Sequence, residues 1–233
     1  MIILQGRSVS GGRAEGRLHC FHRVGAAAVK RAGLDPQYEK QRLTQARIIS
    51  TEQLEALSGR CRQEVSGSAA GEAALVFSTH AALLDDENFV QCIQEIIEQE
   101  TCCAEYAVQQ AGKRFAAIFE NLEDAYMRER GSDVMDVTWR LLRNLAGAGA
   151  GGAELDGPAI VAANELNPTE FIELDRRQVL AIVTRRGSHN SHAAILAQLL
   201  HIPTVCHLGE QLQADFHGRL ACVDGSAGTL TIY

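Results

Sequence analysis

Residues 179–205 constrain the fold more than any other stretch, because their hydrophobic period changes abruptly. Residues 179–183 form a short, uninterrupted apolar run that is typical of a buried strand. A polar turn around Gly187 follows, and Pro203 marks a later break. Between these two points apolar residues repeat every four positions, as on one face of a helix, in the pairs Ile195/Leu199 and Leu196/Leu200. The stretch therefore predicts a strand, a tight turn and a helix of about three turns.

His192 lies at the polar start of this helix, where the chemistry of a histidine is altered. Ser188, Asn190 and Ser191 can each act as the N-cap, and this places His192 in the first turn. Unpaired backbone N–H groups and the positive end of the helix dipole favour an anion there. The same field disfavours an imidazolium, so we expect a neutral, nucleophilic ring near neutral pH. A phosphoryl group satisfies both conditions.

Two plainer interpretations apply to the same region. A histidine near the start of a helix is often only a surface or capping residue. The local histidines and cysteine are also potential metal ligands, namely His189, His192, His201, Cys206 and His207. No CxxC or HExxH spacing organises them, so the sequence predicts no metal site. His201 and His207 are interpreted as helix-end and loop residues.

The overall composition is that of a globular protein in water. Of 233 residues, 46% are hydrophobic and 22% are charged, which suffices for one large domain or, as we expect, two smaller ones. No apolar run approaches the roughly 20 residues that cross a bilayer, and the N-terminus lacks a signal-peptide pattern. We therefore expect a cytoplasmic protein with reduced cysteines and no membrane partner. A net charge of −7 without a basic patch argues against nucleic acid as a partner.

The N-terminus and the middle of the chain differ in character. Residues 2–5 and 17–21 are predicted strands, separated by a glycine-rich turn over residues 6–16. From about residue 34 to residue 146 the pattern is helical. The expected helices cover residues 36–66, 72–84, 103–122 and 123–145, with a further piece capped by Asp85 or Asp86. They predict an antiparallel bundle of four main helices.

The C-terminal part returns to short strands after a flexible, glycine-rich connector at residues 148–152. The predicted strands cover residues 159–163, 179–183, 204–206, 219–223 and 229–233. Asn167 caps a short helix after the first of these, and Asp224–Gly225 forms the turn before the last. The pattern is that of an α/β domain interrupted by a helical domain.

The motif around His192 resembles the phosphohistidine domain of enzyme I of the phosphoenolpyruvate-dependent sugar phosphotransferase system, a family related to pyruvate phosphate dikinase and phosphoenolpyruvate synthase. The family pattern is Gly-Gly-x-Thr-Ser-His-x-Ala/Ser-Ile-Leu/Met-Ala-Arg, followed by Pro-Ala/Thr-Val. The matching residues are Gly187, Ser191, His192, Ala194, Ile195, Leu196, Ala197, Pro203 and Val205. The departures are Ser188 for glycine, Asn190 for threonine, Gln198 for arginine, and Phe171 where a small hydroxyl residue often lies.

This resemblance implies the site. His192, rather than His189, is the expected phosphorylated residue, and the family's attacking atom is Nε2. Gly187, Asn190 and Ser191 are expected to bind the phosphoryl group.

The resemblance also implies the fold and the partner. Enzyme I has an α/β phosphohistidine domain of the swivelling β/β/α type, interrupted by an all-α four-helix bundle domain that docks the phosphocarrier HPr. Here the α/β domain is expected at residues 1–24 and 147–233, and the helical domain at residues 25–146. Further family-like runs lie at residues 76–86, 126–136 and 165–170. The residues expected to face HPr are His80, Leu83, Asp86 and Arg130, although Asp86 also fits a plain helix N-terminus.

The function implied is phosphoryl transfer through a phosphohistidine, between a phosphoenolpyruvate-binding domain and HPr. The chain lacks the family's C-terminal barrel, which binds phosphoenolpyruvate and magnesium, so we expect no cofactor within it. Three alternatives stay open. The first is the enzyme I-like terminal domain of a multidomain carrier, such as the phosphotransferase subunit of dihydroxyacetone kinase. The second is the mobile domain of a dikinase or synthase, which the long helical insert argues against. The third is a degenerate module that binds HPr without chemistry.

Overall fold

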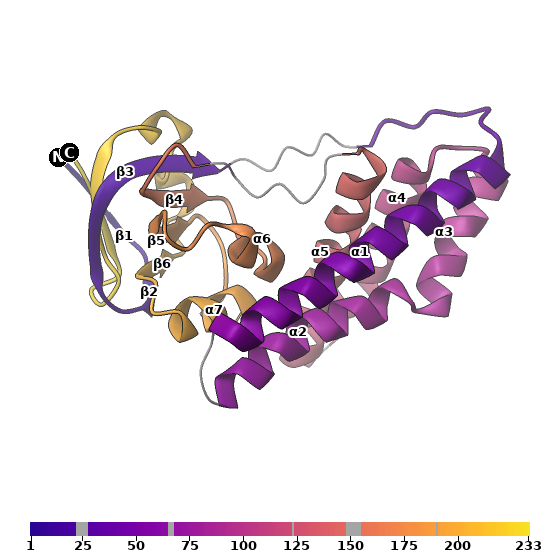
Figure 1. Ribbon diagram of the computed structural model, residues 1–233. Coiled ribbons are helices and arrows are strands. Elements are labelled where there is room, and N and C mark those ends of the chain that lie inside the picture. The colour runs from indigo at the N-terminus through magenta and orange to yellow at the C-terminus, as the bar shows by residue number, and fades with distance from the viewer. Residues whose placement is uncertain (22–27, 65–67, 123, 148–154, 190) are drawn as a thin grey trace. The chain divides into compact units, whose positions relative to one another are not determined.

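The computed structural model describes residues 1–21, 28–64, 68–122, 124–147, 155–189 and 191–233. It divides into two compact units, each described separately below (Figure 1). One unit comprises Met1–Arg23, Gln63–Ala73 and Gly151–Tyr233, and the other comprises Val24–Arg62 and Ala74–Ala150. Residues 63–73 thus group with the first unit, although the sequence analysis assigned them to the helical domain. In the described part of the chain, no helix combines the length and apolar character needed to cross a membrane.

The first unit is built on a mixed eight-stranded sheet in the order β1-β8-β7-β3-β4-β5-β6-β2. Its strands are β1 (Ile2–Gln5), β2 (Arg7–Ser10), β3 (Arg13–Phe21), β4 (Ala159–Ala163), β5 (Val179–Thr184), β6 (Thr204–Cys206), β7 (Leu220–Asp224) and β8 (Thr229–Ile232). The central run from β3 through β4 and β5 to β6 is parallel, and the other neighbours are antiparallel. Parallel neighbours bring the carboxyl ends of β4 and β5 to the same edge of the sheet.

Gly6 connects the two edges of this sheet. It alone separates β1, which pairs with β8, from β2, which pairs with β6. The sheet must therefore curl until its edges meet at Gly6. A side chain does not fit at this junction, because a Cβ on Gly6 would lie 2.4 Å from the carbonyl oxygen of Cys206.

Residues 6–16 largely form strands rather than the predicted turn. The sequence analysis assigned residues 6–16 to a turn, whereas this segment contains β2 and the first residues of β3. Local glycine content suggested a turn, but pairing with β6 and β7, which are distant in sequence, decides the conformation. The other strands confirm their predictions to within two residues at each end.

Two short helices pack on this sheet, α6 (Pro168–Glu173) and α7 (His192–Leu199). Asn167 caps α6 as predicted: its side-chain oxygen accepts the Glu170 N–H at 2.7 Å, and the Glu170 carboxylate accepts the Asn167 N–H at 3.0 Å. α7 buries Leu196 and Ala197 completely, so its apolar face is fixed against the unit. The buried core of this unit includes Leu4, Leu18, Ile160, Phe216, Leu230 and Ile232.

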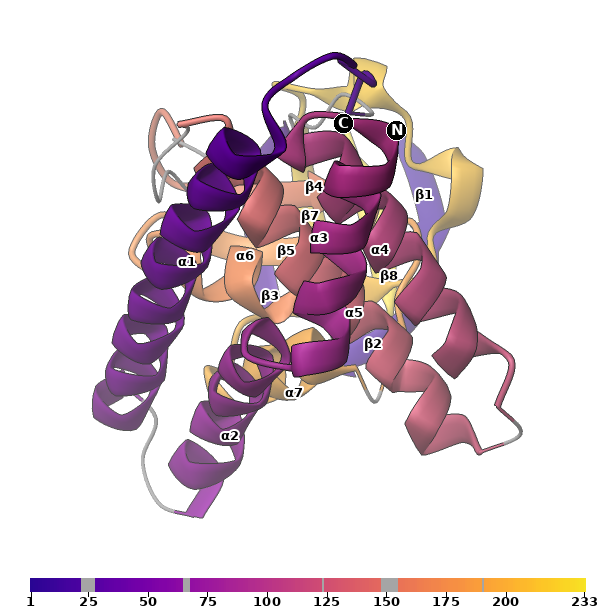
Figure 2. The same ribbon diagram turned by 90° about the vertical axis from the view of Figure 1, so that its right-hand side faces the viewer.

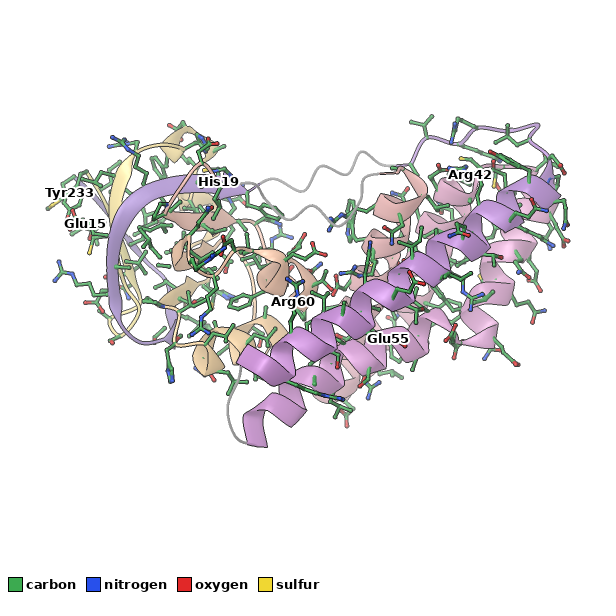
Figure 3. All side chains as sticks on the ribbon, viewed as in Figure 1. Glu15, His19, Arg42, Glu55, Arg60 and Tyr233 are labelled. Atoms are coloured by element: carbon green, nitrogen blue, oxygen red, sulfur yellow. The ribbon has the colours of Figure 1, made fainter. Side chains whose placement is uncertain are left out.

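The second unit consists of helices, shown face-on in Figure 2. In the described residues they are α1 (Pro36–Glu64), α2 (Ser68–Leu84), α3 (Glu87–Glu100), α4 (Ala104–Glu120) and α5 (Ala125–Leu145). The further piece expected after Asp85 or Asp86 is α3, a full helix of 14 residues beside the four main ones. Asp86 is its N-cap, because the carboxylate accepts the Phe89 N–H at 2.9 Å. Figure 3 labels two charged residues of α1, Glu55 and Arg60, and both side chains are exposed.

α4 and α5 pack closely because Gly112 has no side chain. A Cβ at this position would lie 2.3 Å from the hydroxyl oxygen of Thr138 on α5. Thr138 is 1% exposed, and its hydroxyl donates to the Val134 carbonyl at 2.7 Å. The threonine is thus held in place by its own helix and cannot easily give way.

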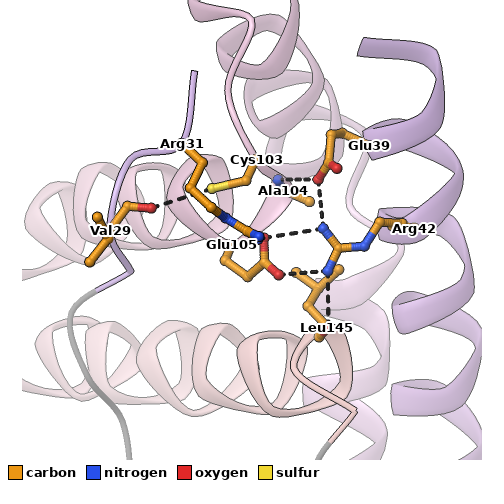
Figure 4. Close-up of polar contacts among 8 residues, drawn as sticks. All are labelled: Val29, Arg31, Glu39, Arg42, Cys103, Ala104, Glu105 and Leu145. Carbon is orange, nitrogen blue, oxygen red and sulfur yellow. Dashed lines mark hydrogen bonds and ion pairs between the residues drawn. The ribbon is translucent and has the colours of Figure 1, made fainter. Parts of the chain in front are cut away.

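A polar network joins the ends of three helices in this unit (Figure 4). Glu39, which is 3% exposed, accepts the Ala104 N–H at the start of α4 at 2.8 Å and Nη1 of Arg42 at 2.7 Å. Arg42 also donates to Glu105 at 2.6 Å and to the Leu145 carbonyl at the end of α5 at 3.0 Å. The hydrogen bond to Glu105 raises the pKa of the Arg42 guanidinium. The network therefore satisfies helix-end groups that burial would otherwise leave unpaired.

Candidate functional site

Ser191 begins α7 as the N-cap. Its backbone is extended, and its hydroxyl oxygen accepts the Ala194 N–H at 3.2 Å. His192 is consequently the first residue of α7, which confirms that it lies in the first helical turn. The helix geometry leaves the N–H groups of His192 and Ala193 without an intrahelical acceptor. Asn190 and the side chain of His192 lie outside the part that the structure describes.

The turn between β5 and α7 is anchored to the neighbouring strand. The N–H of Arg185 donates to the Ala163 carbonyl at 3.0 Å, and that of Arg186 donates to the Asn164 carbonyl at 2.8 Å. Gly187 then adopts a φ of +124°, a left-handed conformation that side chains rarely tolerate. Glycine is therefore required where the chain turns from the strand into the helix.

An open cavity lies in front of this turn and encloses about 350 Å³. It is lined by Val9, Glu165, Leu166, Phe171, Ile182, Thr184, Arg186, Gly187, Ser188, Ser191, Ala193, Ala194, Thr204 and Cys206. The structure thus brings the predicted residues Gly187 and Ser191 together at one site. Hydroxyl groups, a helix N-terminus and a cation are groups that bind phosphate-like anions. The cavity lies at the carboxyl ends of parallel strands, the usual ligand edge of such a sheet.

Phe171 of α6 forms an apolar wall of this cavity and is 4% exposed. Cys206 forms another part of the wall, and burial raises the pKa of its thiol. His189, His201 and His207 are all exposed. Within the described residues, no group of three or more histidine, cysteine or acidic side chains is arranged to hold a metal ion.

A second concave surface lies on the helical unit and encloses about 370 Å³. This helical groove is lined by Leu83, Asp86, Phe89, Phe115, Phe119, Val134 and Val137. Two of the residues expected to face a partner, Leu83 and Asp86, therefore belong to one surface. Arg130 on α5 is partly exposed and already interacts with other groups. The sequence analysis missed Phe115 and Phe119, because helical spacing alone does not distinguish a groove from a core.

His80 does not lie on that surface. Its side chain is 1% exposed, with Nε2 at 3.2 Å from a carboxylate oxygen of Asp133 and Nδ1 at 3.3 Å from one of Asp136. The expectation that His80 faces a partner is therefore wrong for this conformation. Two carboxylates of α5 hold the ring inside the bundle, and burial without them would be costly for a polar ring.

Two solved structures of enzyme I proteins match nearly the whole of this chain. An NMR solution structure of Enzyme I (nEIt) matches with a TM-score of 0.73 and 26% identity, over 98% of this chain and 92% of that one. The N-terminal domain of "Enzyme 1 - Nitrogen" matches with a TM-score of 0.68 and 29% identity, over 98% and 93% of the two chains.

Family models give the same assignment. Residues 5–130 match the "PEP-utilising enzyme, N-terminal" family and residues 155–228 match the "PEP-utilising enzyme, mobile domain" family, where PEP is phosphoenolpyruvate. The chain belongs to the phosphoenolpyruvate-utilising enzymes.

Several relatives share this similarity. The phosphoenolpyruvate-protein phosphotransferase of Geobacillus stearothermophilus is 31% identical over 98% of this chain and 39% of its own length. That of Enterococcus faecalis is 32% identical over 99% of this chain and 40% of its own length. The phosphoryl donor subunit of the PEP-dependent dihydroxyacetone kinase of Pantoea ananatis is 33% identical over 76% of this chain and 37% of its own length. The chain therefore spans about two fifths of these relatives.

Proposed function

We propose that this chain accepts and returns a phosphoryl group at His192, as the phosphohistidine and HPr-docking part of an enzyme I type phosphotransferase. The observation that carries the proposal is the position of His192, at the first residue of a helix whose N-terminal residues line a cavity with hydroxyl groups and Arg186 in its walls. Relatives named phosphoenolpyruvate-protein phosphotransferase support the reaction class.

The reaction is an in-line exchange between two imidazoles. The lone pair on Nε2 of His192 forms a bond to phosphorus while the nitrogen–phosphorus bond of phospho-HPr breaks. The electron pair of the broken bond returns to the HPr histidine, which leaves as a neutral ring. No proton has to move, so the protein contributes chiefly by positioning and electrostatics.

The local contacts suit that role. The free N–H groups at the start of α7 point along the helix axis toward an incoming anion. Ser191 keeps its O–H available as a donor while its oxygen caps the helix. Gly187 lets the backbone approach without a side chain in the way. Asn190, adjacent to Ser191 in sequence, is also assigned to binding of the phosphoryl group.

The helical groove is the proposed docking site for HPr. Its lining is apolar apart from Asp86, which supplies one carboxylate at the rim. Such a surface complements a partner that presents basic residues around an apolar patch. Leu83, Asp86 and Arg130 are the proposed contact residues. His80 is withdrawn from this set because it is buried.

The phosphoenolpyruvate and magnesium sites are assigned, as part of this proposal, to the three fifths of the relatives that this chain does not span. The distinguishing experiment compares phosphoryl donors. The purified chain should become labelled from phospho-HPr and should not become labelled from phosphoenolpyruvate with magnesium. Labelling from phosphoenolpyruvate with magnesium would contradict the assignment of the phosphoenolpyruvate site to the part that this chain does not span. A failure to label from either donor would contradict phosphoryl transfer itself.

Docking is tested with a pair of charge-neutralising variants. Asp86→Asn removes the rim charge but keeps an oxygen that accepts the Phe89 N–H, so the helix cap survives. Asp85→Asn is the matched control, because Asp85 pairs with Arg47 and does not line the groove. We expect calorimetric titration to show about threefold weaker HPr binding for Asp86→Asn at low salt, with a smaller difference at high salt. Equal effects of the two variants would move the docking site elsewhere.

A second assignment is favoured by one relative, the dihydroxyacetone kinase phosphoryl donor subunit of Pantoea ananatis. On this alternative the chain is one carrier domain within a longer relay to dihydroxyacetone kinase. The two assignments share the chemistry at His192 and differ in the final acceptor. Offering the labelled protein a kinase subunit and a sugar-specific phosphotransferase component separately would distinguish them by which one receives the label.

A further inference from the structure

Thr184 is the last residue of β5, and its side chain is largely buried. It is 6% exposed and lines the cavity in front of α7. Its hydroxyl makes no hydrogen bond to any residue that the structure describes, whereas its own backbone carbonyl accepts the Leu208 N–H at 3.1 Å. The hydroxyl oxygen lies only 3.6 Å from the point where a Cβ on Gly187 would stand, so the glycine leaves space in front of it. The hydroxyl can therefore donate to an oxygen of a ligand in the cavity.

Arg186 adds a cation to the same cavity. Its side chain is exposed and forms no ion pair with any described residue. The adjacent Arg185 behaves differently: its Nε donates to the Leu212 carbonyl at 2.5 Å, and its guanidinium lies 3.5 Å from the Glu210 carboxylate. Of two consecutive arginines, one is thus committed to the fold and the other is available to a ligand.

The charge balance of the cavity depends on Arg186. The charged side chains that line it are Glu165 and Arg186. Without the arginine, Glu165 would give the walls a negative charge and would oppose a phosphoryl group. With the arginine, the charges of Glu165 and Arg186 cancel, and the positive end of the α7 dipole determines the sign of the potential in the cavity.

We propose that Thr184 and Arg186 bind the phosphoryl group carried by His192, from the strand side of the site. The inference rests on the proposed function. The Thr184 O–H and the Arg186 guanidinium would each donate to a phosphoryl oxygen, while the N–H groups of α7 donate from the helix side. The group would therefore be held between the end of β5 and the start of α7. Arginine is well suited to this because its planar fork matches phosphate oxygens.

The test uses phosphoryl transfer from phospho-HPr to the full chain, followed by hydrolysis of the isolated phosphohistidine. Thr184→Val preserves shape and removes the hydroxyl, whereas Thr184→Ser restores it. Arg186→Gln removes the charge. We expect each of Thr184→Val and Arg186→Gln to slow transfer about tenfold and to change the hydrolysis half-life. Thr184→Ser should stay within about threefold of the parent.

Two matched controls exclude a structural effect. Thr204→Val removes another buried hydroxyl of the same cavity, which already donates to the Ile202 carbonyl at 2.9 Å. Arg177→Gln removes a cation that pairs with Asp175 away from the cavity. Once unfolding curves show that both variants are folded, Arg177→Gln should transfer at the parent rate. Thr204→Val should be slowed less than Thr184→Val, because the Thr204 hydroxyl is already engaged. Glu165→Gln should shift transfer in the opposite direction to Arg186→Gln, because it removes the opposing charge.

The outcomes separate this inference from the proposed function. A parent protein that takes no label from phospho-HPr contradicts the proposed function. A parent that is labelled, with Thr184→Val and Arg186→Gln equal to their controls, overturns the roles of Thr184 and Arg186 alone. Equal slowing in Thr184→Val and Thr184→Ser would show that packing, rather than the hydroxyl, is responsible, and would also overturn the role of Thr184.

Discussion

Gly112→Ala should destabilise the helical unit, against the usual preference of helices for alanine. In an exposed helix the change would stabilise by about 0.8–1 kcal/mol. Here the new methyl would meet the Thr138 hydroxyl oxygen at 2.3 Å and its methyl carbon at 2.6 Å. Overpacking of this kind costs about 1–3 kcal/mol. Because Thr138 is buried and hydrogen-bonded, we expect a net loss of about 1–2 kcal/mol.

Gly59→Ala is the matched control within the same unit. Gly59 lies inside α1, and a Cβ there would have no neighbour within 4 Å. This variant should stabilise the unit by about 0.5–1 kcal/mol. The second test is Thr138→Ala in the Gly112→Ala background, which removes the two closest atoms. The double variant should be more stable than the sum of the single changes, by about 1 kcal/mol or more.

Urea unfolding followed by tryptophan fluorescence is the appropriate assay, because the one tryptophan of the chain, Trp139, is next to Thr138 on α5. The same close packing lies beside the helical groove, since Val137 and Phe115 belong to its lining. Gly112→Ala should therefore also weaken HPr binding. Stabilisation by Gly112→Ala, or additive effects in the double variant, would refute the packing argument.

Two further predictions concern charge and capping. Partial burial alone would raise the pKa of the Glu105 carboxyl. The hydrogen bond from Arg42, a backbone hydrogen bond and the charges of Arg42 and Arg31 together outweigh burial, so the net pKa lies below the ordinary 4.5. Stability from this pair is therefore present above that value and lost as the pH falls through the lower folded-state pKa. Arg42→Met should cost about 2 kcal/mol at neutral pH, because buried Glu39 loses its cation partner and keeps just the Ala104 N–H among the described groups, and should flatten the acid side of the stability profile. Asn167→Ala should cost about 1 kcal/mol in urea unfolding of the sheet unit by loss of the α6 cap, whereas Asn167→Asp should be nearly neutral.

Local chemistry made much of the fold predictable. The apolar run of β5, the cap of α7 and the capping box of α6 are all determined by residues within a few positions of one another. The sheet unit interrupted by helices followed from the change of hydrophobic period near residue 34 and again near residue 157. These features need no knowledge of distant contacts.

The features that the sequence did not predict depend on contacts between distant parts of the chain. β2 forms because β6, almost two hundred residues away, pairs with it. His80 is buried because Asp133 and Asp136 meet it from another helix. The sequence predicts a strand that ends at residue 183 and a turn that contains Arg186, and only the cavity brings Thr184 and Arg186 together. Partners that come from distant parts of the chain leave no local signal in the sequence.

The central claim is that His192 carries the phosphoryl group, and mapping the label tests it most directly. The chain is labelled from phospho-HPr, digested at neutral to alkaline pH to preserve phosphohistidine, and read by mass spectrometry alongside His192→Ala and His189→Ala. We expect the phosphoryl group on His192, no label in His192→Ala and normal label in His189→Ala. Label on His189, or a normally labelled His192→Ala, would contradict the account.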